Sequence, residues 1–291
     1  MKTKTQAYLT RQKMLTNDYE IFHYSDKGLQ NVNLHHHDFY ECYFFVSGDV
    51  TYIIEGKSYT LQSGDIILIN SKELHQPIIN NKEVPYERIV VWLDKNFVDS
   101  LSMEDTKLNR CFEDIQKENV IRTDLEGQQS IKSILNKLLK LADYSGMGME
   151  LLYRSYLTEL LITLNNLLFY NTNKVNITIE KSTLIDEIIS YINTHVEEDI
   201  KIEDLSNQFF ISRYHLLRVF KKHSKTTLHK FIVQKKLIYA KELILKGMPI
   251  IEVYKQCGFG DYSNFFRAFK NEYGMTPKQF YELMVQEEPF Q

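Results

Sequence analysis

An internal repeat in the last third of the chain constrains its fold more than any other feature of the sequence. When residues 203–231 are displaced by 49 positions, seven of the 29 positions are identical. The identical pairs are Glu203 and Glu252, Phe210 and Phe259, Arg218 and Arg267, Phe220 and Phe269, Lys221 and Lys270, Thr227 and Thr276, and Phe231 and Phe280. A unit that occurs twice indicates a duplicated module, because a solenoid needs at least three copies.

Each copy of the repeat predicts two helices that are separated by a tight turn. The first helix is short, at 202–208 in one copy and 250–257 in the other. The second helix follows a capping residue, Ser212 or Asp261, and its apolar residues have the spacing of a buried face: Leu216, Val219 and Phe220, or Phe265 and Phe269. This arrangement is typical of a helix-turn-helix, whose second helix enters the major groove of DNA. One helix at 228–245 would hold the two second helices about one DNA turn apart, roughly 34 Å.

The charge of the chain is concentrated in the same region. Residues 212–281 contain 14 Lys/Arg and 4 Asp/Glu, a balance of +10, whereas the remainder carries −13 and the whole chain −3. A basic block of this kind is expected of a protein that binds the phosphate backbone. The charge alone is equally consistent with a solvated surface, and the repeat favours DNA binding.

The repeat region also resembles a known family. The residues from Gly258-Phe259 to Phe280 follow the pattern GF…S.F.R.FK…G.TP..F, and the segment 203–282 is similar to the DNA-binding domain of AraC/XylS-type transcription regulators. The sequence departs from the family pattern at three positions. Lys225 replaces a usual glycine, Tyr254 a small residue, and Leu217 a residue that is often polar.

The resemblance implies contacts with double-stranded promoter DNA, and RNA polymerase as a further partner. By position, the candidates for base or adjacent contacts are Tyr214, Arg218, Tyr262, Ser263, Asn264 and Arg267. Arginine pairs with guanine and asparagine with adenine, each adding about 1–3 kcal/mol of discrimination. Phosphate contacts or intrahelical salt bridges remain open for the two arginines, and half-buried packing for the two tyrosines. Lys221, Lys222 and Lys270 are interpreted as phosphate contacts.

The first hundred residues have the pattern of a β meander or barrel. Residues 50–54, 58–61 and 66–69 are rich in β-branched and aromatic side chains. Gly48, Gly56 and Gly64 separate them at eight-residue intervals, which is typical of short strands joined by turns.

Helical periodicity replaces this pattern from Gly127 onward. Residues 127–145 and 148–170 predict two amphipathic helices, whose Leu/Ile stripes need a partner surface. That surface could be a second subunit or the barrel of the same chain. Residues 171–179 are expected to form a linker, after which Thr183 and Asp186 predict a capping box that begins the next helix.

A histidine cluster precedes the predicted strands. The residues His35, His37, Glu41 and Gly48, followed by His75, have the spacing of the cupin motif. Alternate residues of a strand share a face, so several of these side chains can point into a small barrel. Three imidazoles and a carboxylate would suit Mn, Fe, Ni or Zn. Metal binding, effector contact and a purely structural role all remain open. Asn70 and Lys72 replace a usual Pro and Gly, which argues against catalysis, and we expect no cofactor.

Aromatic residues near the cluster are candidates for lining a ligand pocket, because rings stack on sugar faces, although ordinary core packing has the same pattern. They are Phe39, Tyr40, Tyr43, Tyr52 and Trp92. The sensor domains of AraC-type regulators resemble cupins, which implies that a small-molecule effector, a carbohydrate in the first instance, binds in the barrel. The candidate effector-binding residues are His35, His37, Glu41, Tyr43, His75 and Trp92.

Together these patterns predict an α+β protein with two domains. We expect a cupin-like effector-sensing barrel at 1–120, a helical dimerisation segment at 121–172, and a double helix-turn-helix at 182–285. The interpretation is a cytoplasmic, homodimeric, ligand-responsive transcription regulator that is not an enzyme and does not enter the membrane. A cupin metalloenzyme tethered to a DNA-binding domain is the alternative, and an architectural or RNA-binding protein is a third class. Three widely spaced cysteines are consistent with a reducing compartment.

Overall fold

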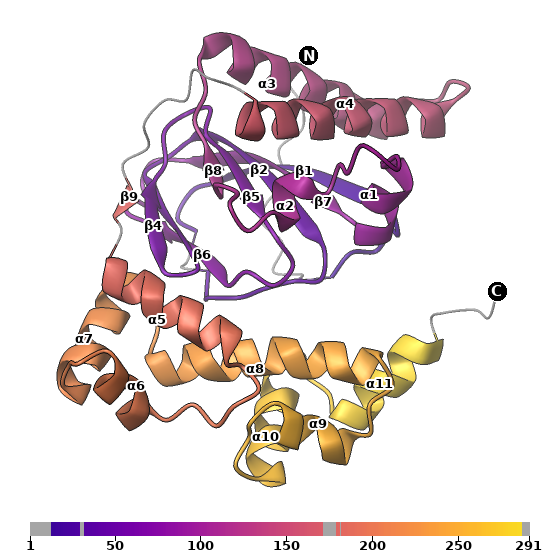
Figure 1. Ribbon diagram of the computed structural model, residues 1–291. Helices are drawn as coiled ribbons and strands as arrows, with labels where there is room; N and C mark the ends of the chain where they lie inside the picture. The colour runs from indigo at the N-terminus through magenta and orange to yellow at the C-terminus, as the bar shows by residue number, and fades with distance from the viewer. Residues whose placement is uncertain (1–12, 30–31, 171–178, 181, 287–291) are drawn as a thin grey trace. The chain divides into compact units, whose positions relative to one another are not determined.

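The computed structural model describes residues 13–29, 32–170, 179–180 and 182–286. The chain divides into two compact units, Met1–Glu180 and Lys181–Gln291. The first unit contains all the strands and the second is helical (Figure 1). An α+β fold with a β-rich first domain and an all-helical second domain is therefore confirmed.

Two antiparallel sheets form the centre of the first unit. The five-stranded sheet has the order β1-β7-β2-β5-β8 and the four-stranded sheet the order β6-β3-β4-β9. Their bounds are β1 Tyr19–Asp26, β2 Tyr40–Ser47, β3 Val50–Ile54, β4 Lys57–Thr60, β5 Ile66–Ile69, β6 His75–Ile79, β7 Tyr86–Leu93, β8 Val120–Ile121 and β9 Ile179–Glu180. The predicted strands at 50–54 and 66–69 coincide with β3 and β5. The predicted strand at 58–61 overlaps β4 but is shifted by one residue toward the C-terminus.

Glycine makes the tight connections of these strands feasible. Gly48, Gly56 and Gly64 have φ values of 138°, 73° and 91°, a region that a residue with a Cβ rarely adopts. The eight-residue spacing of glycines in the sequence thus corresponds to three turns between consecutive strands: the turn at Gly56 joins the paired strands β3 and β4, and those at Gly48 and Gly64 join one sheet to the other.

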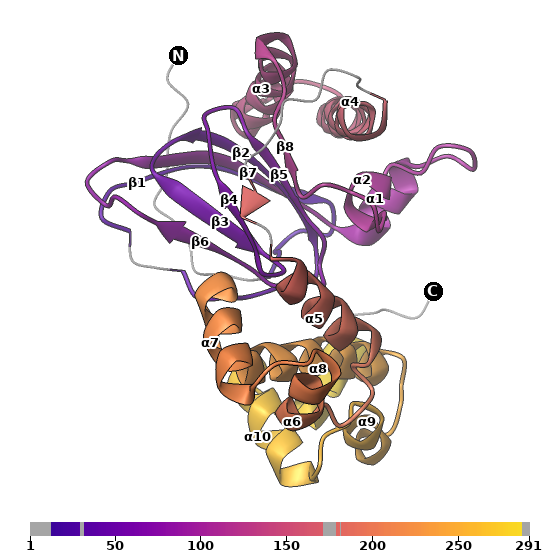
Figure 2. The ribbon, with the colours of Figure 1, turned by 60° about the vertical axis from the view of Figure 1, so that its left-hand side comes forward.

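Alternating side chains give the five-stranded sheet two apolar faces. In β2, Cys42 and Phe44 pack on the outer face, and Tyr43 and Phe45 pack between the two sheets. Helices α3 (Leu125–Lys140) and α4 (Met149–Phe169) lie side by side against the outer face (Figures 1 and 2). Their Leu/Ile stripes are therefore buried against the strands of their own chain. The short helices α1 (Lys95–Leu101) and α2 (Arg110–Glu113) contribute to the same core, and the turn η1 (Leu141–Asp143) extends α3.

In the second unit, two groups of helices pack against different parts of one long helix, α8. The first group precedes α8 in the chain and the second follows it (Figure 1). The bounds are α5 Thr183–Thr194, α6 Ile202–Gln208, α7 Arg213–Ser224, α8 Leu228–Leu245, α9 Ile250–Gln256, α10 Tyr262–Tyr273 and α11 Pro277–Gln286. The predicted helices at 202–208 and 228–245 coincide with α6 and α8.

The structure corrects two details of the sequence-based prediction in this unit. The N-cap of α5 is Ser182, whose side chain accepts from the Ile185 amide, and not Thr183, which is already the first helical residue. The repeat also has two offsets: α6 and α9 begin 48 residues apart, whereas α7 and α10 begin 49 apart. Glu203 and Glu252, and Phe210 and Phe259, are therefore not structural equivalents. The second turn is one residue longer because it contains Gly260.

The predicted linker at 171–179 falls mostly outside the described residues, and its last residue begins β9. No helix within the described ranges is both long and apolar enough to cross a membrane.

Candidate functional site

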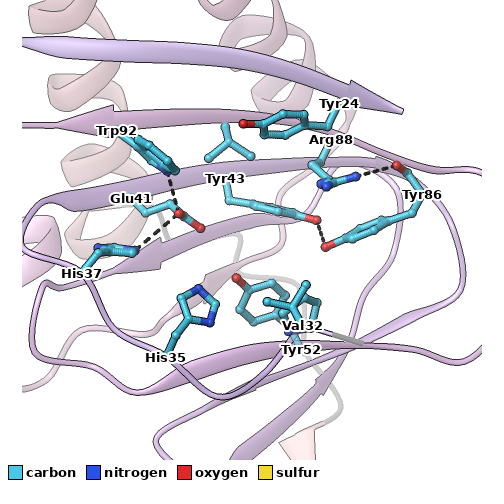
Figure 3. A pocket seen from close by; sticks show the side chains of 12 residues that line it. Tyr24, Val32, His35, His37, Glu41, Tyr43, Tyr52, Tyr86, Arg88 and Trp92 are labelled. Atoms are coloured by element: carbon cyan, nitrogen blue, oxygen red, sulfur yellow. Dashed lines mark hydrogen bonds and ion pairs between the residues drawn. The ribbon is translucent and has the colours of Figure 1, made fainter. Parts of the chain in front are cut away.

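A small pocket, with a cavity volume of about 40 Å³, lies between the two sheets of the first unit (Figure 3). Residues from both sheets line it, together with the segment that precedes β2. They are Tyr24, Val32, His35, His37, Glu41, Tyr43, Tyr52, Pro77, Tyr86, Arg88, Val90 and Trp92. A concave site with an apolar wall and a few convergent polar groups is the usual form of a small-molecule site.

One end of the pocket carries an acidic group among histidines. Glu41 accepts a hydrogen bond of 2.9 Å from the Trp92 indole, and its carboxylate lies 3.4 Å from His37 Nε2 (Figure 3). Burial alone would raise the pKa of Glu41, but His37, His35 and the Trp92 hydrogen bond together lower it. Glu41 is therefore a buried carboxylate that stays charged near neutral pH.

The other end of the pocket carries a buried cation among phenols. Arg88 is 2% exposed, and its guanidinium donates to Asp26 at 2.5 Å and to the Tyr86 carbonyl at 2.9 Å. The Tyr43 hydroxyl donates to the Tyr86 hydroxyl, and burial raises the pKa of Tyr43 well above its usual value. Tyr43 is thus a neutral hydrogen-bonding group near pH 7.

The structure brings most of the predicted pocket residues together. His35, His37, Glu41, Tyr43, Tyr52 and Trp92 line the cavity. His75 is fully buried beside His35, with ring centroids 4.2 Å apart, and Phe39 stacks on His37 within the core between the sheets.

Tyr40 was wrongly included among the candidate pocket residues. It lies on the outer face of the sheet, where it stacks on Phe112 and its hydroxyl donates to Glu113 at 2.7 Å. Tyr40 and Tyr43 are an odd number of residues apart on one strand, so they point to opposite faces.

Three polar pocket residues were missed by the sequence analysis: Tyr24 on β1, and Tyr86 and Arg88 on β7. A local signal did exist in β7, since Tyr86, Arg88, Val90 and Trp92 alternate along the strand and share the face that lines the pocket.

The second candidate site consists of the exposed faces of α7 and α10. All nine predicted DNA-contacting residues are exposed on these helices. Beneath them, Leu216 and Phe220 of α7, and Phe265 and Phe269 of α10, are fully buried. The predicted division into an inward apolar face and an outward polar face is confirmed at these four positions, whereas Val219, also predicted to face inward, is only half-buried.

The two helices begin in the same way. Ser212 accepts a hydrogen bond from the His215 amide, and Asp261 accepts one from the Asn264 amide at 2.7 Å. These N-caps fix the start of each helix, and therefore which side chains its first turn presents to solvent.

The exposed side chains differ between the two helices. Tyr214 is 76% exposed and Arg218 lies over its ring at 6.0 Å. Arg267 donates to the Asn264 side-chain oxygen at 2.7 Å, and the Asn264 amide donates to Asp261. Tyr262 is 39% exposed and packs edge-on against Tyr254, so half-buried packing applies to Tyr262 but not to Tyr214.

Comparisons with known proteins identify a family model in each of the two units. Residues 19–161 match the model of the AraC-like ligand binding domain, and residues 205–282 match a helix-turn-helix domain model. The transcriptional activator RhaS of Salmonella paratyphi A is 22% identical over 253 residues, which cover 84% of this chain and 85% of that protein.

Two solved structures are also similar to the chain. Fatty-acid-bound ToxT from Vibrio cholerae is 15% identical, covers 92% of this chain and 96% of its own, and has a TM-score of 0.40. The C-terminal domain of AraT from Geobacillus stearothermophilus is 24% identical, covers 36% of this chain and 88% of its own, and has a TM-score of 0.35.

The two family models together span about three quarters of the chain, and each coincides with one of its compact units. The chain belongs to the AraC/XylS-type family: it is a DNA-binding transcription regulator whose activity is modulated by an effector.

Proposed function

We propose that this regulator contacts bases in promoter DNA with the first turns of α7 and α10 and binds a small polyhydroxylated effector, of the carbohydrate class, between its sheets. The observation that carries the DNA half of the proposal is the exposure of all nine candidate residues above two buried apolar faces. We propose promoter DNA and RNA polymerase as its partners, which would place the protein in the cytoplasm and make it a regulator rather than an enzyme.

The spacing of the two recognition helices is set by α8. Its 18 residues span about 27 Å at 1.5 Å per residue. Helices α7 and α10 pack against different parts of it. We propose that this connector holds α7 and α10 so that both enter successive major grooves, roughly 34 Å apart, on one side of a duplex.

Within this interface we assign different roles to the exposed residues. Asn264 and Arg267 carry the side chains best suited to pair with adenine and guanine, and Arg218 and Tyr214 occupy the corresponding part of α7. Ser263 and Tyr262 lie in the same first turn of α10. Lys221, Lys222 and Lys270 lie farther along each helix and would contact phosphates, which orient the protein without selecting sequence.

The chemistry of the pocket supports a polyhydroxylated effector. Polar groups stand at both ends, Glu41 and the histidines at one and Arg88 with two phenols at the other, so hydroxyl groups could be bound along the whole ligand. The Arg88 charge is already compensated by Asp26, which favours a neutral ligand over a carboxylate. Aromatic rings of Trp92 and Tyr52 complete walls on which a sugar ring can stack.

A covalent path joins the pocket to the DNA-binding unit. Strand β9 pairs with β4, and Tyr59 of β4 belongs to the core between the sheets. The last residue of β9, Glu180, directly precedes the second unit. A ligand that alters the packing of β4 would therefore act on the residues at which the DNA-binding unit begins.

The effector proposal is tested by calorimetric titration of the full chain with monosaccharides and sugar phosphates. Tyr43→Phe should weaken binding of the best ligand by about tenfold, since one buried hydrogen bond contributes about 1–1.5 kcal/mol. Tyr40→Phe is the matched control on the same strand but on the opposite face, and it should leave the affinity unchanged. Equal effects of the two substitutions would contradict the proposed pocket.

The regulatory proposal is tested by selecting binding sites from genomic fragments, with and without the best sugar. A defined sequence motif whose recovery changes with the sugar supports it. Recovery of fragments without any shared sequence would contradict sequence-specific binding and favour an architectural role instead.

We further propose that the chain forms a homodimer through the outer face of α4. The inward stripe of this helix is already buried, whereas Leu151 is 72% exposed beside a shallow groove that also contains Arg154 and Glu159. In two antiparallel copies related by a twofold axis, Arg154 of one copy would face Glu159 of the other.

The dimer proposal is tested by sedimentation experiments. Leu151→Glu should produce monomers, whereas Leu125→Glu, at an equally exposed position of α3, should not. An unchanged mass for both variants would exclude this face.

A further inference from the structure

Three buried potential ligands converge at one end of the pocket. One nitrogen each of His37 and His75 and one carboxylate oxygen of Glu41 lie within 4.8 Å of one another, and all three residues are buried. They come from different sheets, because Glu41 belongs to β2 and His75 to β6. His35 pairs with His75 through its backbone but lies outside this set of three.

The tautomer of both histidine rings follows from their hydrogen bonds. His37 Nδ1 lies 2.8 Å from the Phe39 carbonyl, and His75 Nδ1 lies 2.9 Å from the Glu73 carbonyl. A carbonyl oxygen can only accept, so each Nδ1 carries the proton and, in a neutral ring, each Nε2 presents a lone pair. A backbone acceptor on the far nitrogen is the arrangement that orients metal-binding histidines.

Both Nε2 atoms lack a hydrogen-bond partner among the residues that the structure describes, although they are buried. His37 is 4% exposed and His75 is fully buried, so water does not satisfy them readily. An unsatisfied buried polar atom costs about 1–3 kcal/mol. Two unsatisfied histidine nitrogens beside one carboxylate indicate a site for an electron-pair acceptor, such as a metal ion.

Electrostatics at this end of the pocket also fits a cation. Glu41 Oε2 lies 3.4 Å from His37 Nε2, which is an ion-pair distance when the ring is protonated and is close to the separation of about 3.3 Å between two donors around a tetrahedral ion.

We propose that His37, Glu41 and His75 form a binding site for one divalent first-row transition metal ion. Two imidazoles and one carboxylate suit zinc, cobalt, nickel, iron or manganese, and they are a poor set for magnesium or calcium, which prefer oxygen ligands. Three protein ligands leave coordination positions open toward the cavity that His37 and Glu41 line. If the proposed effector binds there, its hydroxyl oxygens would take these positions. The metal site itself does not depend on that effector.

The test is a titration of tag-free, full-length, chelator-treated protein with Co²⁺ and Zn²⁺. One Co²⁺ per chain should bind with the visible absorption of an ion bound by protein nitrogen, and Zn²⁺ should displace it. His37→Gln and His75→Gln should each weaken binding at least about tenfold. The matched control is His23→Gln, since His23 is also partly buried in the barrel but pairs with Glu87 outside the cluster. Binding of less than about 0.1 equivalent, or unchanged binding by both cluster variants, would overturn the site.

A measurement on the wild-type protein avoids any dependence on how the variants fold. Long-range ¹H–¹⁵N spectra report the state of each imidazole nitrogen. Zn²⁺ should shift the Nε2 signals of two histidines whose Nδ1 stays protonated, and it should leave His23 unchanged. Shifts confined to exposed histidines would overturn the proposal. The sugar titrations of Tyr43→Phe and Tyr40→Phe do not require the metal, so failure here and failure of the proposed effector site remain distinguishable.

Discussion

The two helix-turn-helix units share one architecture but present different surfaces. Helix α7 carries four Lys/Arg and no acidic residue, whereas α10 carries two Lys/Arg and one glutamate. At its N-terminal end, α10 has a chain of polar side chains from the N-cap Asp261 through Asn264 to Arg267, and α7 has the exposed ring of Tyr214 beside Arg218. Phe220 of α7 and Phe269 of α10 are both fully buried and occupy equivalent positions of the repeat.

This difference indicates that the two copies kept their cores and diverged in their contribution to binding. Positive charge without acidic neighbours increases affinity for any duplex. Side chains whose amide and guanidinium groups are held together near a helix start are suited to base edges in the major groove. We therefore expect the first unit to supply more of the affinity and the second more of the specificity.

The largest expected effect is that of Arg267→Ala. Loss of its guanine contact should reduce binding to the selected site by about 1–3 kcal/mol, or roughly 5–150-fold, while affinity for unrelated DNA changes little. Arg218→Ala, the equivalent substitution in the first unit, should cost more of the affinity for unrelated DNA and less of the discrimination between sequences. Competition gel shifts with specific and unrelated duplexes measure both. A uniform loss for Arg267→Ala would remove the proposed division between the units.

The lysines of the two units can be compared through the salt dependence of DNA binding. The double substitution Lys221→Gln and Lys222→Gln should reduce the slope of log affinity against log salt by about 1.8, since each phosphate contact contributes about 0.9. Lys270→Gln in the second unit should reduce it by about half as much. The preferred sequence should be the same in all three proteins. If the lysine substitutions change that preference, these residues contact bases and the assignment to phosphates is wrong.

The smallest expected effect concerns the ends of the two recognition helices. Lys225 caps α7 with φ at +56°, and Gly274 caps α10 with φ at +73°. This left-handed conformation is strained for a residue with a Cβ, so Lys225→Gly should stabilise the unit by about 0.5–1 kcal/mol. Gly274→Ala should destabilise it by about 1 kcal/mol. Amide exchange in α8 reports both changes. If both substitutions changed the stability in the same direction, the C-caps of α7 and α10 would not be equivalent.

Most of the second unit could be predicted from sequence because its signals are local. Apolar residues at helical spacing and the caps Ser212 and Asp261 lie within one or two turns of what they define. The error in the repeat arose at Gly260, since one extra residue in a turn leaves both flanking helices intact and shifts only their offset. An alignment without gaps cannot represent that change.

The pocket was only partly predictable because it depends on pairing between distant strands. Tyr24 and Arg88 face each other through the pairing of β1 with β7, which joins residues 60 or more positions apart. Nothing near either residue in the sequence specifies that pairing. The cluster of His37, Glu41 and His75 was found because the spacing of the first two fits a motif, while the tautomers of its histidines follow from the carbonyls of Phe39 and Glu73, which only the folded backbone places.

The central claim is that α7 and α10 occupy two successive major grooves on one side of one duplex. Hydroxyl-radical and methylation-protection footprints of the full chain on its selected site test this directly. The account predicts two protected major-groove segments about 10 base pairs apart on the same face of the DNA. A single protected segment, or two segments on opposite faces, would contradict it.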